Sequence, residues 1–338
     1  MKEKFLVRKA SIELLFKKLI EQKKVILAPV EKRGRLNFER VISLSEVATN
    51  YIQTNTPAKK AVFPRTEILF KYTGNPNAVQ MEGFNIERVP ETVVWGCRPC
   101  DAAGFSSLHA IFNWDYKDEI FNSRYNKTTI IAFSCKTADE YCFCTSVNGG
   151  PGNTEGCDIL LTELKSGDYL CELISEKGDK IKASIPEVFE KESDESKEEN
   201  LAVIVNRFNP EEIKFKLESN FDNKVWEEQA QACLGCGTCA FICPACACFD
   251  IQDEKHGKEG VRMRCWDSCG FSMFTLHTSG HNPRENQDQR WRQRIMHKFS
   301  YMPERQHMIG CTGCGRCSRA CPAGINILEN LESIINLN

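Results

Sequence analysis

The stretch CLGCGTCAFICP occupies residues 233–244, and CTGCGRCSRACP occupies residues 311–322. Each stretch has the spacing C-x2-C-x2-C-x3-C-P, which holds [4Fe–4S] clusters in two-cluster ferredoxins. In such runs the first three cysteines bind one cluster and the fourth binds the other. The spacing therefore predicts two clusters with crossed ligands. The first cluster would use Cys233, Cys236, Cys239 and Cys321, and the second would use Cys311, Cys314, Cys317 and Cys243.

Zinc sites and disulfide frameworks also use closely spaced cysteines. Zinc usually takes two C-x2-C pairs, whereas this chain has two complete quartets, each followed by a proline. The two quartets therefore favour iron–sulfur clusters.

The composition indicates a cytoplasmic redox protein. The chain has 19 cysteines in 338 residues, and its start, Met1 to Lys4, does not resemble an export signal. Apolar runs such as residues 129–133 are far shorter than the about 20 residues that cross a bilayer. In a reducing compartment, many cysteines indicate metal or redox chemistry rather than disulfides. The net charge of −2 gives no general attraction for nucleic acid or an anionic membrane, so we expect neither as a partner.

The distribution of cysteines divides the chain into two predicted domains. Residues 1–225 contain seven cysteines, and residues 226–338 contain twelve. In the first part, helical and extended apolar patterns alternate, which predicts an α/β or α+β domain. The expected helices cover residues 9–23 and 101–114, and the expected strands cover residues 25–27, 92–95, 129–133 and 158–162.

The second domain is predicted to be an α-helical ferredoxin with two [4Fe–4S] clusters. Residues 244–310 separate the two motifs, a far longer link than a compact βαββαβ ferredoxin has. Residues 285–298 fit one of its helices. The basic residues nearby are expected to face an acidic partner or solvent, because no aromatic interleaving or recognition motif accompanies them. They are Arg284, Arg290, Arg292, Arg294, Lys298 and Arg305. The charged residues 186–200 predict a solvated helical excursion.

The chain resembles the iron–sulfur electron-transfer subunits that occur as the β subunit of soluble sulfhydrogenase-type [NiFe] hydrogenases and as the corresponding iron–sulfur subunit of anaerobic sulfite reductase. The resemblance covers nearly the whole chain and rests on short matches in the right order. These matches are Pro64-Arg65-Thr66-Glu67, Arg98-Pro99-Cys100-Asp101, Cys142-Phe143-Cys144-Thr145-Ser146, Asp158-Ile159-Leu160-Leu161-Thr162, Trp266-Asp267-Ser268-Cys269, Gly280-His281-Asn282, His297-Lys298-Phe299 and Pro303-Glu304-Arg305.

The resemblance implies a role in wiring a larger oxidoreductase complex. In that family this subunit passes electrons between a subunit that binds flavin and NAD(P) and a catalytic subunit of the hydrogenase or sulfite reductase type. The chain itself has no nucleotide loop or other catalytic apparatus, so we expect no catalytic residue in it. The alternative hypothesis is an iron–sulfur enzyme that reduces a small substrate at a cluster with an open iron.

Four cysteines of the first domain predict a third [4Fe–4S] cluster. Cys100 and Cys135 each follow a predicted strand, and Cys142 and Cys144 lie in the next loop, so the four can meet at one end of a sheet. They also fall within the segments that resemble the family. Cys97 could replace one of them, because Cys97-x2-Cys100 is itself a chelating pair. The other possibility is that these residues are simply buried thiols.

A further quartet lies between the two ferredoxin motifs. Its C-x-C and C-x3-C spacings suit another iron–sulfur cluster or a zinc ion. The quartet is Cys246, Cys248, Cys265 and Cys269. Alternatively, Cys246 packs beside the second cluster, because it follows Cys243 so closely.

Overall fold

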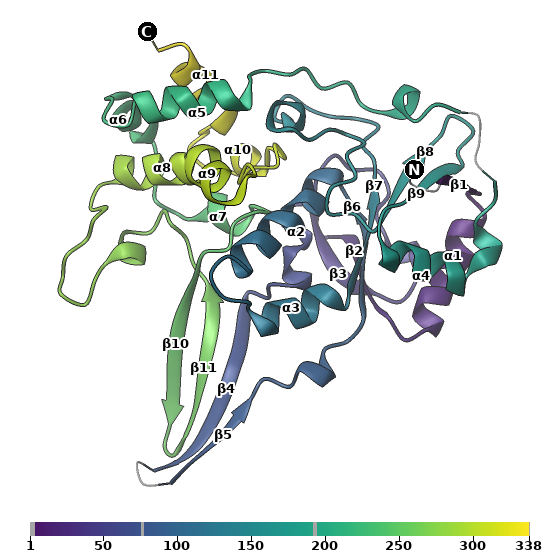
Figure 1. The fold of residues 1–338 in the computed structure, drawn as a ribbon, viewed down its shortest axis with the longest axis horizontal. Helices are drawn as coiled ribbons and strands as arrows, with labels where there is room; N and C mark the ends of the chain where they lie inside the picture. Colours follow the sequence, from purple (N-terminus) through teal and green to yellow (C-terminus); the bar gives the residue numbers. More distant parts are fainter. Residues whose placement is uncertain (1–3, 76–77, 192–194, 338) are drawn as a thin grey trace.

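The computed structural model describes residues 4–75, 78–191 and 195–337 (Figure 1). Its larger sheet has seven strands in the order β1-β9-β8-β7-β6-β2-β3. Strands β2, β6, β7 and β8 are parallel neighbours, and antiparallel strands complete both edges. The bounds are β1 Lys4–Val7, β2 Val25–Lys32, β3 Arg35–Val41, β6 Thr92–Cys97, β7 Thr128–Phe133, β8 Ile159–Glu163 and β9 Tyr169–Leu173.

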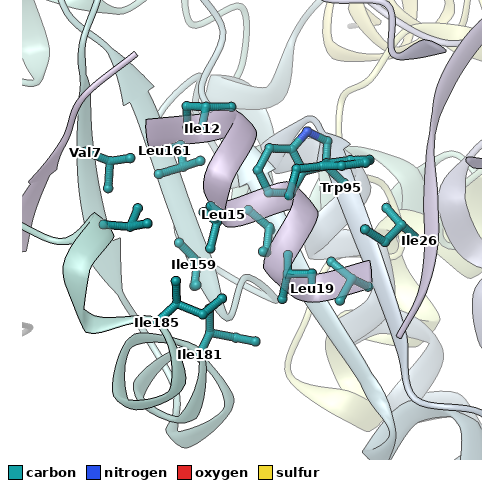
Figure 2. Close-up of a cluster of buried hydrophobic side chains, with 14 of the residues drawn as sticks. Val7, Ile12, Leu15, Leu19, Ile26, Trp95, Ile159, Leu161, Ile181 and Ile185 are labelled. Carbon is teal, nitrogen blue, oxygen red and sulfur yellow. The ribbon is translucent and has the colours of Figure 1, made fainter. Parts of the chain in front are cut away.

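Helices cover both faces of this sheet. One face packs against α1 (Ser11–Glu21) and α4 (Glu176–Ser184), and the other packs against α2 (Pro99–Phe112) and α3 (Glu119–Asn126). Figure 2 shows Ile12, Leu15 and Leu19 of α1 directed at the sheet beside Trp95 and Leu161. Their helical spacing places these apolar side chains on one face, whose burial stabilises the layer. The strands and helices expected from sequence in this region are therefore present.

A second sheet of four antiparallel strands forms an arm that extends from the body (Figure 1). Its order is β10-β11-β4-β5, with bounds β4 Thr66–Asn75, β5 Ala78–Gly83, β10 Phe249–His256 and β11 Glu259–Trp266. A buried ion pair between Arg264 of β11 and Glu67 of β4 ties the two hairpins together at their base. Arg124 and Asp118 of the α2–α3 region join the same network.

The arm corrects the expectation of a purely α-helical second domain. The segment between the two cysteine motifs contains the hairpin β10–β11, and β11 pairs with β4 from the first part of the chain. The two predicted regions are therefore joined through a shared sheet. The structure is mixed α/β, and it does not confirm a helical ferredoxin fold for residues 226–338.

Short helices form the rest of the second region around a core of their own. Figure 1 shows them gathered at one end of the molecule, above the arm. The bounds are α5 Pro210–Ser219, α6 Val225–Ala230, α7 Thr238–Phe241, α8 Gln287–Met296, α9 Met302–Gln306, α10 Arg316–Arg319 and α11 Ile327–Ile335. A π-helical turn, His297–Tyr301, joins α8 to α9. The helix expected over residues 285–298 is thus present.

The helical excursion expected over residues 186–200 is wrong. That segment has only two short 3-10 turns, Pro186–Val188 and Glu198–Asn200, and residues 192–194 lie outside the described part. The other 3-10 turns are Leu44–Glu46, Ala58–Ala61, Ile86–Arg88, Cys144–Val147 and Ser272–Thr275. Within the described residues, no helix has the length and apolarity needed to cross a membrane.

Candidate metal centres

The four cysteines predicted to bind a third cluster lie together beyond the carboxyl ends of central strands of the larger sheet. Strands β6 and β7 are parallel, so the loops that follow them meet on the same side. Burial raises the pKa of Cys135 to about 11 and that of Cys144 to about 12. The charges of Cys135 and Cys142 contribute to the raised pKa of Cys144, and Cys100 is within electrostatic reach of Cys135. We call Cys100, Cys135, Cys142 and Cys144 the N-terminal site.

Cys97 lies elsewhere, although it is only three residues from Cys100. Its side chain is fully buried in the hydrophobic core between the sheet and α2. Burial raises its pKa well above the ordinary value, and the nearby Cys157 raises it further. Cys171 is also fully buried, in the core on the opposite face of the sheet. The geometry therefore favours Cys100 over Cys97 for the N-terminal site.

The first ferredoxin quartet lines one pocket at the surface. Cys233, Cys236 and Cys239 share this pocket with Cys321, which belongs to the second motif. This grouping is the one that crossed ligation predicts. Cys236 is exposed, and the Thr238 hydroxyl beside it lowers the pKa of its thiol. We call these four residues the outer site.

The second quartet is more enclosed. Cys243 and Cys314 are buried, and burial raises the pKa of Cys317 to about 12. Lys298 donates to the Cys243 sulfur at 3.3 Å, and Cys311 also lies within its electrostatic reach. Lys298 thus lies between Cys243 of the first motif and Cys311 of the second, the two motifs that the predicted crossed ligation would join. We call Cys311, Cys314, Cys317 and Cys243 the inner site.

The inner site is built directly against the N-terminal site. Gly313 accepts a hydrogen bond at 3.0 Å from the backbone N–H of Phe143. A Cβ on Gly313 would lie 2.5 Å from the backbone of Cys144, and one on Gly315 would lie 2.4 Å from the carbonyl oxygen of Tyr141. Only glycine permits such a close approach at these positive φ angles. A single cavity is lined by cysteines of both sites.

Buried cations accompany the thiols, which corrects the expectation of a basic helix face toward a partner or solvent. Arg290, Arg294 and Lys298 recur at helical spacing along α8 and the π-helical turn, and all three are buried. Arg294 donates to the backbone oxygen of Cys239 at 2.7 Å, and one of its nitrogens lies 3.6 Å from the Cys246 sulfur. Their positive charge offsets the charge of deprotonated thiolates in a site of low dielectric.

Two other basic residues of that group are less enclosed. Arg292 stacks on Phe221 with its guanidinium carbon 4.0 Å from the ring centroid, and Arg305 lies over Trp114 at 5.1 Å. Arg292 of α8 and Arg305 of α9 therefore do not belong to the buried set of cations.

The further quartet is only partly assembled. Cys248 and Cys269 are hydrogen-bonded to each other, which lowers the pKa of Cys269 to about 6, and Cys246 lies close to both. Cys265 instead sits within β11, opposite Asp250 on one side and Thr66 on the other.

Across the residues that the structure describes, no three Cys, His, Asp or Glu side chains surround one point as a single metal ion requires. A [4Fe–4S] cluster spreads its four thiolates over four irons, so its ligands are spaced more widely.

Buried hydrogen-bond donors without partners adjoin the three cysteine sites. Buried donors in proteins are nearly always paired, so each exception calls for an explanation. Five of the exceptions among the described residues are Arg98 Nε, Ser134 Oγ, Arg294 Nε, Thr312 Oγ1 and Arg316 Nη1. Four of them lie within two residues of a site cysteine in sequence, and hydrogen bonds to sulfur are a known means of tuning such clusters. The thiols and these donors together fit [4Fe–4S] clusters.

Several site residues were not identified from the sequence. Gln53 donates to the Cys100 sulfur at 3.0 Å, and Gln287 donates to the Cys233 sulfur at 3.2 Å. Arg319 pairs with Asp139 and donates to the Cys142 sulfur at 3.2 Å. Proximity to a cysteine motif in the chain could have pointed to Arg319, but no local pattern marks Gln53 or Gln287.

Comparisons with known proteins agree with the cysteine chemistry. The family model described as "4Fe-4S dicluster domain" matches residues 232–325. The chain is 31% identical over 317 residues to Sulfhydrogenase 2 subunit beta of Pyrococcus furiosus, an alignment that covers 91% of this chain and 92% of that protein. No solved structure matches the chain significantly.

Proposed function

The chain belongs to the family of iron–sulfur subunits that includes the sulfhydrogenase β subunit, and we propose that it relays single electrons between two other subunits of an oxidoreductase complex. A [4Fe–4S] cluster takes up and releases one electron at a time, which suits a relay. The polypeptide contributes by fixing the order of the sites and by placing donors and cations around them.

The observation that carries this proposal is the continuous series of thiol sites. The N-terminal and inner sites share a wall at Gly313 and Cys144, and Cys317 of the inner site also lines the pocket of the outer site. The outer site then reaches the surface at Cys236. The sites thus follow one another from the N-terminal site through the inner site to the outer site at the surface. Such a series would give electrons a path between two partner subunits.

We propose one [4Fe–4S] cluster at each of the three sites. The outer and inner clusters follow the dicluster spacing, with Cys321 and Cys243 exchanged between the motifs. The third cluster would be held by Cys100, Cys135, Cys142 and Cys144. A further iron–sulfur or zinc site at Cys246, Cys248, Cys265 and Cys269 stays a proposal. The contacts pair Cys248 with Cys269, whereas Cys246 is hydrogen-bonded to Cys243, as expected if Cys246 packs beside the second cluster.

The proposed partners follow from the family. One is a reductase subunit that binds FAD and NAD(P), and the other is a catalytic subunit of the hydrogenase or sulfite reductase type. The name of the relative from Pyrococcus furiosus describes a sulfhydrogenase subunit, which supports the first catalytic type. The abundance of cysteines supports a complex in the reducing cytoplasm.

The test uses the full chain reconstituted anaerobically with iron and sulfide. We expect about twelve irons, or about sixteen if the further quartet also holds a [4Fe–4S] cluster. The clusters should be reduced by dithionite, but the chain alone should turn over neither NAD(P)H nor hydrogen nor sulfite. Turnover of any of these substrates at the rate of the native complex would refute the relay and support the alternative enzyme hypothesis.

A further inference from the structure

A buried ion pair lies between the N-terminal site and the inner site. Arg316, which directly precedes the inner ligand Cys317, pairs with Asp101, which directly follows Cys100. The distance between Arg316 Nη2 and Asp101 Oδ2 is 2.7 Å, and both side chains are 98% or more buried. The pair therefore joins residues 215 positions apart at the point where the two sites meet.

Arg316 is held firmly in this position by the first part of the chain. It donates to the Thr54 backbone oxygen at 2.8 Å and to the Thr54 hydroxyl at 2.7 Å, and also to the side-chain oxygen of Gln53. Gln53 in turn donates from its amide nitrogen to the Cys100 sulfur at 3.0 Å. A chain of hydrogen bonds thus connects the guanidinium of Arg316 to a ligand of the N-terminal site.

The same guanidinium is within electrostatic reach of both sites. Cys314 of the inner site and Cys100 of the N-terminal site both act on Arg316. Its Nη1 is buried and has no hydrogen-bond partner among the described residues. An arginine is always protonated in proteins, so its charge at this position is fixed.

We propose that Arg316 and Asp101 act in opposite directions on the reduction potentials of the N-terminal and inner clusters. Arg316 raises both potentials and Asp101 lowers both, and together they balance electron exchange between the two clusters. Arg316 is a positioning and tuning residue, since it binds no iron itself. Reduction adds negative charge to a cluster, and a nearby buried cation favours that change while a nearby buried carboxylate opposes it. This inference rests on the third cluster of the proposed function.

The competing explanation is that the ion pair only fastens the two parts of the chain together. Breaking a buried pair leaves an uncompensated charge, so either explanation predicts a loss of stability when one partner is removed. The sign of the potential shift separates the two explanations. A fastening role would give the same kind of damage for both partners, whereas tuning would give opposite shifts.

The experiment compares Arg316→Gln, Arg316→Lys and Asp101→Asn in the full reconstituted chain, by redox titration with dithionite followed by EPR. We expect Arg316→Gln to lower the potentials of the inner and N-terminal clusters and Asp101→Asn to raise them. Arg316→Lys keeps the charge and should shift them least, and it remains informative if Arg316→Gln does not fold. The outer cluster should change little in every variant, and Arg305→Gln, at the surface, should leave all potentials unchanged.

The results distinguish this inference from the proposed function. Opposite shifts at two clusters support it. Shifts of the same sign in Arg316→Gln and Asp101→Asn, or unchanged potentials in fully loaded variants, would overturn it while the relay stands. About eight irons in the unaltered chain would instead remove the third cluster, and the inference would fall together with that part of the proposed function.

Discussion

The outer and inner sites have nearly the same sequence but contrasting surroundings. Cys236, in the middle of the outer motif, is exposed, and Leu234, two residues before it, is 71% exposed. At the equivalent places in the inner motif, Cys314 is buried and Thr312 is only 8% exposed. The difference teaches that the same cysteine spacing can lie in an exposed or in an enclosed place, and that the surrounding elements decide which. Under the proposed relay, the outer site is the one that could exchange electrons with a partner.

The backbone explains how one motif serves both places. Gly235 and Gly237 of the outer motif and Gly313 and Gly315 of the inner motif all have positive φ angles. The outer glycines face the side chains of Gln287 and Phe271, while the inner ones press against the backbone of residues 141–144. The same local conformation is therefore covered by individual side chains in the outer motif and by the backbone of residues 141–144 in the inner motif.

The largest expected effect separates the two sites by changing their central cysteines. Cys236→Ser should lose only the outer cluster, so that iron falls from about twelve to about eight per chain. The iron content of Cys314→Ser should fall further, to about four per chain, because the inner site forms a wall of the N-terminal site. Iron and sulfide analysis with EPR measures both. Equal losses in the two variants would contradict the contrast between an isolated outer site and a supporting inner one.

The next largest effect tests whether the N-terminal site belongs to the series. Cys142→Ser should remove about four irons and leave the signals of the inner and outer clusters in place. Cys171→Ala is the matched control, because Cys171 is fully buried in the core and away from the site. It should keep about twelve irons. If both variants held the same iron as the unaltered chain, the N-terminal cysteines would be structural.

A smaller effect concerns the buried cation of the inner site. Lys298→Met removes the donor 3.3 Å from the Cys243 sulfur. A hydrogen bond to a charged group contributes about 1.5–3 kcal/mol, which corresponds to about 60–130 mV for one electron. We expect the inner potential to fall by that order and the outer potential to stay constant in an EPR-monitored titration. Lys224→Met, at an exposed position, should shift neither; a fall at the outer cluster instead would reverse the assignment of Cys243.

The smallest effect concerns the outer site. Gln287→Met removes a neutral donor 3.2 Å from the Cys233 sulfur, and neutral hydrogen bonds contribute about 0.5–1.5 kcal/mol. The outer potential should therefore fall by about 20–60 mV. Gln293→Met on the same helix serves as the control. A shift as large as that of Lys298→Met would contradict the smaller effect expected of a neutral donor.

Much of the candidate chemistry could be predicted from spacing alone. The two quartets and the strand-end position of Cys100 and Cys135 follow from local patterns. The structure places Cys321 in the pocket of Cys233, Cys236 and Cys239, and the crossed ligation itself stays a prediction. The hairpin β10–β11 could not be anticipated in the same way. Its strand β10 is exposed along its whole length, and the hairpin is held by pairing of β11 with β4, whose partner residues lie 186–199 positions earlier in the chain.

The sequence by itself determined the candidate ligands, because thiol spacing within a motif is a local property that a few residues settle. The tertiary structure decided which side chains surround them. In the folded chain Cys97 is buried in the core, while Cys100 lies at the N-terminal site. Arg294 and Lys298 are buried, and Arg316 pairs with Asp101. These outcomes depend on contacts between residues far apart in the chain, where burial and charge compensation outweigh any local preference.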